Sequence, residues 1–425
     1  MELKKYKLGE ILELQRGYDL PSSLMKKGGV LVAGSNGVIG YHNEARSNHP
    51  CITVGRSGSV GKVHYYEQAT WAHNTALFVK DFKGNNPKYL YYFLKNLHLD
   101  KIFDKGSSVV PSLDRKVVHS LNISFHKDVD IQTRIATVLS NIDRKITLNR
   151  AINQNLEAMA KQLYDYWFVQ FDFPNEKGKP YKASGGKMVW NEKLKREIPQ
   201  GWITKTINEV CTSCRGVSYG KNELLSNGNG VLVFRGNNIE NNHIVYDSNV
   251  AFVPYDLINE EQRIKEGDIV MTMSSGSKAH VGKCAMFYKD SKHTFGAFLS
   301  KFTPKNEMRY MIFLFLISEY FKSLITAFCN GTGINNLTNQ TFDDVILVLP
   351  NENILQQFES KVKPLFSMIG SNEENIEVFT KQRDELLPLL MNGQVSVNSD
   401  LSAYKKKERK SPLLNFKRCV RHLSL

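Results

Sequence analysis

Two glycine-rich loops hold the residues whose types and spacing could act on a phosphate group. They are ITVGRSGSVGK (52–62) and IVMTMSSGSKAHVGK (269–283). A nucleotide-binding P-loop needs two glycines with four residues between them, then lysine, then serine or threonine. Both loops instead have five residues between the glycines, and their lysines precede Val63 and Cys284. We therefore expect no nucleotide site, and we infer that the loops bring backbone and cations close to a nucleic-acid backbone.

Candidate DNA-contacting residues lie in and beside these loops, because small residues let the backbone approach a phosphate that nearby cations neutralise. Arg16 and Arg215 occupy equivalent positions ahead of the loops, and arginine can bind a guanine edge with two hydrogen bonds. A tight turn with a solvated charge is the alternative for each residue. The candidates are Arg16, Arg56, Ser57, Ser59, Lys62, Ser107, Ser108, Arg215, Ser275, Ser277, Lys278, His280, Lys283, Asn330 and Thr332.

Motifs of catalytic sites are incomplete in this chain. Asn86-Pro87-Lys88-Tyr89 lacks the second proline with which an adenine methyltransferase holds a flipped base, so a helix start is the better interpretation. Asp344, Glu359 and Lys361 resemble a nuclease site only in spacing. Residues two apart diverge on a helix, so we expect Glu359 and Lys361 to face solvent.

The cysteines give no metal signal. Cys211-x-x-Cys214 is a lone pair, whereas a structural zinc site needs four ligands. The six cysteines form no disulfide-like pattern, which favours a reducing, cytoplasmic location.

One ordered set of features occurs twice along the chain. Residues 8–17 and 207–216 align with a constant offset, and Gly29–Val32 matches Gly230–Val233. After each glycine loop come an aromatic-rich helical stretch, a polar glycine turn and an apolar strand. These are expected at 89–97, 106–113 and 117–125, and again at 310–321, 331–338 and 342–349. The repeat predicts an α+β fold with two tandem domains of similar topology.

Each copy ends in a heptad pattern, which predicts a long helix that buries a seam against another helix. Val138, Ile152 and Met159 are expected in the second row of the first seam, and Pro364 should kink the second helix or delay its start. The main seam positions are Ile135, Ile142, Leu156 and Leu163, and Leu355, Val362, Ile369 and Ile376.

The two helices are expected to pair with each other as an antiparallel coiled coil. The first is net positive and the second net negative, and Asn149, Asn153 and Asn372 would fix the register. About 35 residues at about 1.5 Å each give a rod of roughly 50 Å, which spans about fifteen base pairs. The alternative is that each helix only covers its own domain.

Composition favours a polyanionic partner. The chain has 425 residues and a net charge of +14. No window has the apolar length of a membrane span, and the N-terminus lacks the apolar core of a signal peptide. A basic chain of this kind usually binds nucleic acid.

The arrangement of motifs resembles the DNA-specificity (S) subunit of type I restriction–modification systems. The resemblance rests on GSSVVPSL (106–113) leading into IQTRIATVLSNIDRKI (131–146), and on IPQGW (198–202) ahead of the second copy. It implies two target-recognition domains on double-stranded DNA, each recognising half of a split sequence. It also implies paired helices that space the halves and bind methyltransferase (M) subunits, with a restriction (R) subunit in the complex.

The resemblance further implies that this chain is not an enzyme and carries no cofactor, because S-adenosylmethionine, ATP and magnesium would belong to partner subunits. The chain departs from the family in its basic tail, and the Ile-Asp-Arg-Lys phrase (142–145) is missing from the second helix. The expected segments are a first recognition domain (1–130), a spacer helix (131–170), a linker (171–198), a second recognition domain (199–350), a second spacer helix (351–393) and a disordered basic tail (394–425).

Two other functions fit the residues less well. One is a stand-alone DNA methyltransferase or nuclease with a divergent site, which methyl transfer by the purified chain would reveal. The other is a coiled-coil scaffold that does not recognise DNA. Selection from random duplexes with the partner subunit present would then enrich no motif.

Overall fold

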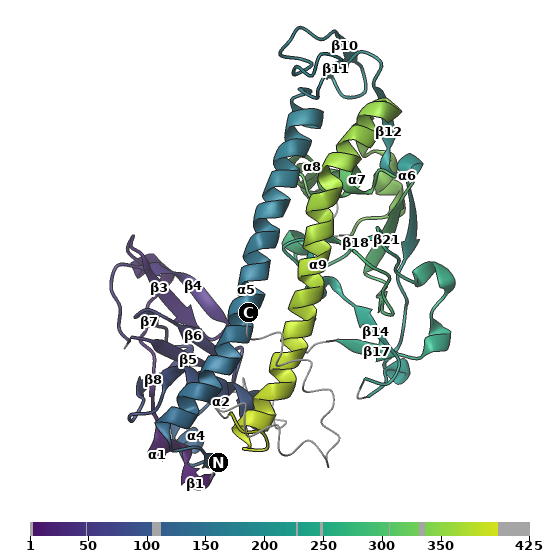
Figure 1. Ribbon diagram of the computed structural model, residues 1–425. Coiled ribbons are helices and arrows are strands. Elements are labelled where there is room, and N and C mark those ends of the chain that lie inside the picture. The colour runs from purple at the N-terminus through teal and green to yellow at the C-terminus, as the bar shows by residue number, and fades with distance from the viewer. Residues whose placement is uncertain are drawn as a thin grey trace, which may run out of the picture. The chain divides into compact units, whose positions relative to one another are not determined.

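The computed structural model describes residues 3–47, 49–103, 112–226, 228–246, 250–305, 307–330 and 336–397 (Figure 1). The chain forms two compact units. The first comprises Met1–Thr147 with Glu377–Leu425, and the second comprises Leu148–Ile376. Ser107, Ser108 and Thr332, together with the tail from residue 398, lie outside the described residues.

The first unit is built on a four-stranded antiparallel sheet, a three-stranded sheet and a terminal strand pair. The four-stranded order is β2 (Glu13–Arg16), β8 (Ala76–Asp81), β5 (Cys51–Gly55) and β6 (Val63–Tyr66). The three-stranded order is β4 (Gly37–His42), β3 (Val30–Gly34) and β7 (Trp71–Ala72), with β3 and β7 parallel. The remaining elements are β1 (Lys4–Lys7) paired with β9 (Asn122–Phe125), and the helices α1 (Leu8–Ile11), α2 (Pro87–Asn96), α3 (Leu99–Phe103) and α4 (Arg115–His119).

The second unit repeats this topology and adds one strand pair. Its four-stranded order is β13 (Cys211–Arg215), β21 (Leu299–Pro304), β18 (Ile269–Thr272) and β19 (Cys284–Met286). Its three-stranded order is β17 (Ala251–Val253), β14 (Val231–Phe234) and β20 (Thr294–Phe295), with β14 and β20 again parallel. The predicted duplication and the α+β class are therefore confirmed. The remaining elements are β12 (Ile203–Thr206) paired with β22 (Ile346–Leu349), β15 (Ile239–Glu240) paired with β16 (His243–Ile244), and the helices α6 (Ile207–Val210), α7 (Arg309–Leu316) and α8 (Glu319–Asn330).

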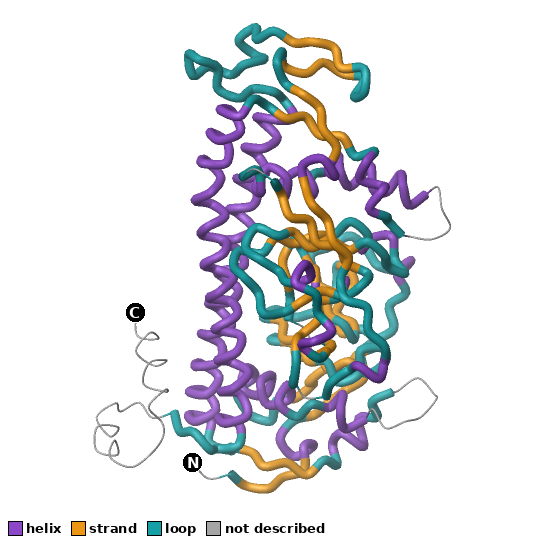
Figure 2. Tube along the Cα trace, turned by 90° about the vertical axis from the view of Figure 1, so that its right-hand side faces the viewer, coloured by secondary structure: helices purple, strands orange, loops and turns teal. Residues whose placement is uncertain are grey.

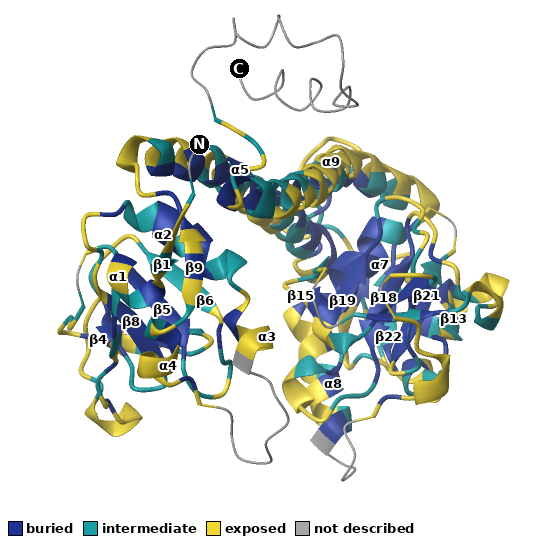
Figure 3. Cartoon of the chain, turned by 90° about the horizontal axis from the view of Figure 1, so that it is seen from below, coloured by how far each residue is buried: buried dark blue, intermediate teal, exposed yellow. Residues whose placement is uncertain are grey.

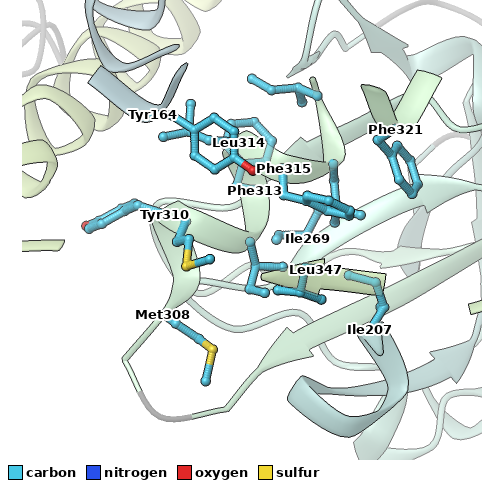
Figure 4. Close-up of a cluster of buried hydrophobic side chains, with 14 of the residues drawn as sticks. Tyr164, Ile207, Ile269, Met308, Tyr310, Phe313, Leu314, Phe315, Phe321 and Leu347 are labelled. Atoms are coloured by element: carbon cyan, nitrogen blue, oxygen red, sulfur yellow. The ribbon is translucent and has the colours of Figure 1, made fainter. Parts of the chain in front are cut away.

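The central strands are apolar because they are buried on both faces. All residues of β5 and β18 are buried, whereas the outer strand β4 exposes Val38, Ile39 and Tyr41 (Figure 3). In the second unit α7 is buried from Tyr310 to Leu316, and Phe313, Leu314 and Phe315 lie in one cluster with Ile269 and Leu347 (Figure 4). Sheet and helix thus hold the strand ends in fixed positions.

The predicted long helices are α5 (Val129–Tyr164), which continues as a π-helical turn over Asp165–Val169, and α9 (Glu352–Met391) (Figures 1 and 2). In the first unit Arg383 Nη1 lies 2.9 Å from Asp143 Oδ1, and Lys145 lies over the Phe379 ring. These contacts pair later residues of one helix with earlier residues of the other, so the helices are antiparallel.

The same direction of pairing occurs in the second unit. Asn372 Nδ2 donates to Asn153 Oδ1 at 2.8 Å, and Asn153 Nδ2 donates to Glu373 Oε1 at 2.7 Å. Further along, the Phe168 ring packs against Phe358. Two of the asparagines expected to fix the register therefore contact each other directly. The antiparallel pairing of the two helices is confirmed.

Most of the seam positions are buried. Ile135, Ile142, Leu156, Val362, Ile369 and Ile376 are buried, while Leu163 and Leu355 are half-buried against the core. The expectation for Met159 is wrong, because its side chain is 55% exposed. A helix of 3.6 residues per turn drifts relative to a seven-residue repeat, and at Met159 the second row has left the seam.

Of the two effects expected of Pro364, a delayed helix start does not occur, and the kink stays a prediction. The helix begins at Glu352 and includes Pro364, whose side chain is exposed. Val362 and Phe366 are fully buried on either side of it. The burial of these side chains outweighs the hydrogen bond that proline removes.

Two segments differ from the sequence expectation. Residues 117–119 belong to α4, which Asp114 caps by accepting a hydrogen bond from Lys116 N at 2.7 Å. Residues 342–343 end a 3-10 helix over Asn339–Asp343. In both copies the final strand is therefore shorter than expected, because a helical turn occupies the residues before it. The strands are β9 and β22.

The segment between the copies contains structure of its own. A hairpin joins β10 (Met188–Asn191) to β11 (Arg196–Pro199). Phe171 and Phe173 are buried against Trp202 within the second unit. The start of the 171–198 segment is thus packed within the second unit by aromatic contacts.

Among the described residues, no single helix has the length and apolar character needed to cross a membrane. Only α7 and α8 taken together pass that test, and they are bent by 54° at their junction.

One glycine in each copy permits a close backbone approach. A Cβ on Gly17 would lie 2.2 Å from His73 O, and a Cβ on Gly216 would lie 2.3 Å from Gly296 O. We expect Gly17→Ala to destabilise the protein by about 2 kcal/mol, because the chain at Gly17 and the chain at Ala72 and His73 must separate. Denaturant unfolding measures this. Gly29→Ala is the matched control, since its Cβ would meet no atom within 4 Å; equal stability losses in the two variants would contradict the explanation.

Candidate nucleic-acid interface

In the first unit the candidate residues gather at one edge of the four-stranded sheet. Because neighbouring strands are antiparallel, the ends of β2 and β5 lie beside the start of β8. Gly17 N donates to Ala76 O at 3.0 Å and Arg56 N donates to Thr75 O at 2.8 Å. We call this set of loops the first loop edge; it comprises residues 16–17, 35–36, 55–62, 73–75 and 112–113.

The second unit has a matching edge with matching hydrogen bonds. Gly216 N donates to Leu299 O at 3.2 Å, and Met273 N donates to Phe298 O at 2.9 Å. The chain after the polar turn is also held alike, since Leu113 N donates to Arg56 O and Leu337 N donates to Met273 O. We call this the second loop edge; it comprises residues 215–216, 236–237, 272–283, 296–298 and 336–337.

The glycine loops close on themselves in the same way in both units. Gly55 N donates to Lys62 O at 2.7 Å, and Thr272 N donates to Lys283 O at 2.8 Å. Gly61 has φ of +78°, and a Cβ there would lie 2.3 Å from Asp100 N. Glycine is therefore required by backbone conformation and close packing, which explains the motif without a bound nucleotide.

Cationic side chains of the first loop edge are held by neighbouring polar groups. Lys62 Nζ donates to Asn36 Oδ1 at 2.9 Å, and Arg56 Nη1 donates to Asn74 O at 3.3 Å. Arg16 is exposed and lies 3.6 Å from Asp19. The candidates Ser57 and Ser59 are half-buried within the loop. The edge thus presents three cations on a short stretch of surface.

In the second loop edge Arg215 connects three loops. Its Nη1 donates to Ala297 O at 3.0 Å and its Nη2 donates to Leu337 O at 3.4 Å. These bonds occupy two of the five donors of the guanidinium, so the structure gives Arg215 a positioning role that sequence reasoning missed. The other candidates lie on the glycine loop, where Ser277 N donates to Ser275 Oγ and Lys283 Nζ lies 3.4 Å from His280 Nδ1. Lys278 begins the exposed turn Lys278–His280, and Asn330 is the last residue of α8.

A cavity of about 400 Å³ opens at the second loop edge. Four of its lining residues come from the glycine loop, namely Ser274, Ser275, Gly276 and His280. Asn237 and Phe298 also line it, and sequence reasoning did not select them. Asn237 could have been found, because the match between Gly29–Val32 and Gly230–Val233 continues to Asn36 and Asn237 at the same offset. Phe298 could not, because its counterpart is Thr75.

The two histidines near the first loop edge, His64 and His73, have lowered pKa values. Burial, and then the charge of Lys62, hold the pKa of His64 below its usual range. Burial also lowers the pKa of His73 despite the nearby carboxylate of Asp19. Both imidazoles are therefore neutral at pH 7, and the positive charge comes from arginine and lysine.

Cys211 and Cys214 lie on β13, and burial raises the pKa of Cys211 to about 12, so its thiol stays protonated. Across the described part of the chain, no cluster of three or more metal-binding side chains occurs.

The expectation that Glu359 faces solvent is wrong. Its carboxylate accepts hydrogen bonds from Met311 N at 2.8 Å and Tyr310 N at 3.4 Å, so it caps the start of α7. Burial raises the pKa of Glu359 to about 7 despite these bonds. Lys361 is exposed, as expected. The carboxylate therefore serves helix packing rather than a nuclease-like site.

Comparison with known proteins identifies the family. The model of the type I restriction modification DNA specificity domain matches residues 1–158 and again residues 199–378. The chain belongs to this family. The two matches fall on the two copies recognised in the sequence, and each includes one loop edge.

Named relatives are specificity subunits as well. The type I restriction enzyme MjaIX specificity subunit of Methanocaldococcus jannaschii is 28% identical over 321 residues, which cover 73% of this chain and 69% of that protein. The EcoKI specificity subunit of Escherichia coli is 29% identical over 212 residues, which cover 47% and 44%. The chain thus spans less than half of the second relative.

A solved structure shares the fold. The crystal structure of a type I restriction–modification S subunit from M. genitalium is 16% identical, and the similarity covers 92% of this chain and 96% of that one with a TM-score of 0.53. At this identity the similarity supports the fold of the specificity subunit.

Proposed function

We propose that this chain is the non-catalytic specificity subunit of a type I restriction–modification complex and that it recognises a bipartite, asymmetric DNA sequence. Each loop edge would contact one half of the target. The chain would also bind methyltransferase and restriction subunits and position them there. S-adenosylmethionine, ATP and magnesium would be bound by those partners.

The observation that carries the proposal is the repeated loop edge. Two units with one topology place a glycine loop, an arginine and the chain that follows the polar turn at the same sheet edge. The side chains that each edge presents differ, as Thr75 and Phe298 do at one position. Two similar but non-identical sites in one chain suit a non-palindromic target better than a symmetric dimer does.

The helix lengths support recognition of two separated half-sites. The 36 residues of α5 give about 54 Å at about 1.5 Å per residue. That length corresponds to about sixteen base pairs of B-DNA. We propose that the paired helices set the gap between the half-sites and contribute to the surface for methyltransferase subunits.

Exchange of one recognition unit tests the proposal. Residues 1–130 would be replaced by those of another family member, and targets would be determined by mapping methylated adenines in cells that contain the partner subunits. We expect one half of the target to change while the other half and the gap stay the same. A simultaneous change of both halves would contradict the proposal, and so would an unchanged target.

The phosphate contribution of one lysine gives a second prediction. We expect Lys62→Ala to weaken DNA binding about equally on all sequences and to lower the slope of log affinity against log salt by about one, since one phosphate contact is lost. Titration of labelled duplexes at several salt concentrations measures both effects. Lys182→Ala is the control, because Lys182 is exposed and lies outside both loop edges. A sequence-dependent loss would indicate base contact instead.

A further inference from the structure

We propose that the cavity at the second loop edge binds the major-groove edge of an A·T base pair, with Asn237 and Phe298 as specificity-determining residues. The inference rests on the proposed function, and it adds the base class and the two side chains. Neither Asn237 nor Phe298 is among the DNA-contacting candidates chosen from the sequence.

Asn237 supplies the hydrogen-bonding group. It is exposed, it lines the cavity, and it lies in the turn directly after β14. An asparagine amide can form two hydrogen bonds with the major-groove edge of adenine. Its Oδ1 accepts from the N6 amino group and its Nδ2 donates to N7 when the amide lies in the plane of the base. The adjacent Asn238 holds this turn, because its Oδ1 accepts from Arg235 N at 2.9 Å and its Nδ2 donates to Val245 O at 3.0 Å. The amide of Asn237 is therefore presented on a fixed backbone.

Phe298 supplies an apolar contact in the same cavity. Its side chain is 69% exposed, although burial of a phenyl ring is favourable. The backbone holds it there, since Phe298 O accepts hydrogen bonds from Met273 N at 2.9 Å and Ser274 N at 3.3 Å. An exposed ring on a rigid support can contact the thymine methyl group, which lies in the major groove beside the adenine edge.

The cavity lies among groups that suit a nucleic acid. Ser274, Ser275 and His280 add polar groups to its wall. Lys283 lies next to His280, and Arg215 binds the carbonyl of Ala297, the residue before Phe298. A base edge entering this cavity would therefore have cations close to its flanking phosphates.

The first loop edge differs at the corresponding positions. Thr75 replaces Phe298, and its hydroxyl accepts a hydrogen bond from Ser35 N at 3.2 Å. Asn36, the counterpart of Asn237, accepts a hydrogen bond from Lys62. In the first loop edge, internal hydrogen bonds therefore occupy the Thr75 hydroxyl and the Asn36 amide oxygen. Their counterparts in the second loop edge, Phe298 and Asn237, line the cavity. The two edges are thus expected to prefer different base pairs.

The test measures base preference position by position in the assembled complex of this chain with its methyltransferase subunit. Duplexes that carry every single substitution in the target would be titrated with wild type, Asn237→Ala and Phe298→Ala. We expect wild type to prefer A·T at one position of one half-site by about five- to hundred-fold. Each variant should lose most of that preference while the other half-site is recognised unchanged.

Controls separate the possible failures. Tyr255→Ala removes an aromatic side chain that is 71% exposed but does not line the cavity, and it should leave every preference unchanged. If wild type shows no sequence preference at all, the proposed function fails. If wild type recognises a bipartite target but both variants keep all preferences, only the assignment of Asn237 and Phe298 fails. Uniform weakening without a change of preference would also overturn it.

Discussion

Replacing Phe358 with alanine should lower the free energy of unfolding by about 3–5 kcal/mol, because a fully buried aromatic ring leaves a cavity. Phe358 is 0% exposed. Its ring centroid lies 4.7 Å from that of Phe168 and 5.5 Å from that of Trp167. Both residues belong to the π-helical turn that follows α5. Phe358 therefore joins α9 to the end of α5 within the second unit, and its removal weakens that pairing directly.

Denaturant unfolding of the full chain measures this effect. Met368→Ala on the same helix is the matched control, since Met368 is 52% exposed and its truncation should cost less than about 0.5 kcal/mol. A Phe358→Ala variant as stable as the control would show that the aromatic contact is not formed in solution.

Raising the pH from about 6.5 to 10 should destabilise the second unit through His243. Its Nε2 lies 2.7 Å from Glu157 Oε1 on α5, and its Nδ1 lies 3.1 Å from Glu373 Oε1 on α9. Burial alone would lower the pKa of His243, but the interactions with Glu157 and Glu373 outweigh burial and raise it to about 10. Within the second unit, the protonated imidazole of His243 therefore connects β16 to both long helices.

The direction of the pH effect follows from the raised pKa. The unfolded chain releases the His243 proton near pH 6.5, whereas the folded chain retains it up to about pH 10. The stabilisation is therefore complete below pH 6.5 and is lost as the pH rises towards 10, by about 2–4 kcal/mol in total. The neighbouring Tyr288 stays neutral in this range, because burial and then the two carboxylates raise its pKa well above 10.

Unfolding curves of wild type and His243→Gln at several pH values test this prediction. The difference in stability between the two should be largest at pH 6.5 and should shrink as the pH approaches 10. A difference that does not vary with pH would mean that His243 is not protonated in the folded protein.

The sequence predicted the parts of the fold that repeat or have a fixed period. Two copies of the Arg-Gly and Val-Gly-Lys phrases predicted two similar domains, and both phrases proved to close the same backbone bonds. The seven-residue spacing predicted two paired helices. Such features depend on local conformation and on one apolar stripe, both of which a single sequence displays.

The candidate site was predicted only in part. Lys62 and Lys283 were selected because each follows a glycine of the repeated Val-Gly-Lys phrase, and both lie at the loop edges. Asn237 was missed although the repeat that matches Gly29–Val32 to Gly230–Val233 continues to it, and Phe298 was missed because no local pattern marks it as a cavity residue. The roles of Arg215 and Glu359 were also missed, because each is defined by backbone groups far away in the sequence.

By itself, therefore, the sequence determined the duplication, the fold class and the pairing of two long helices, because these follow from repetition and periodicity along one chain. Only the tertiary structure decided which loops share an edge, where a cavity opens and which ionisable side chains are buried. Those properties arise from contacts between distant segments: the strand ends meet through antiparallel pairing, and the pKa of His243 depends on carboxylates from two different helices.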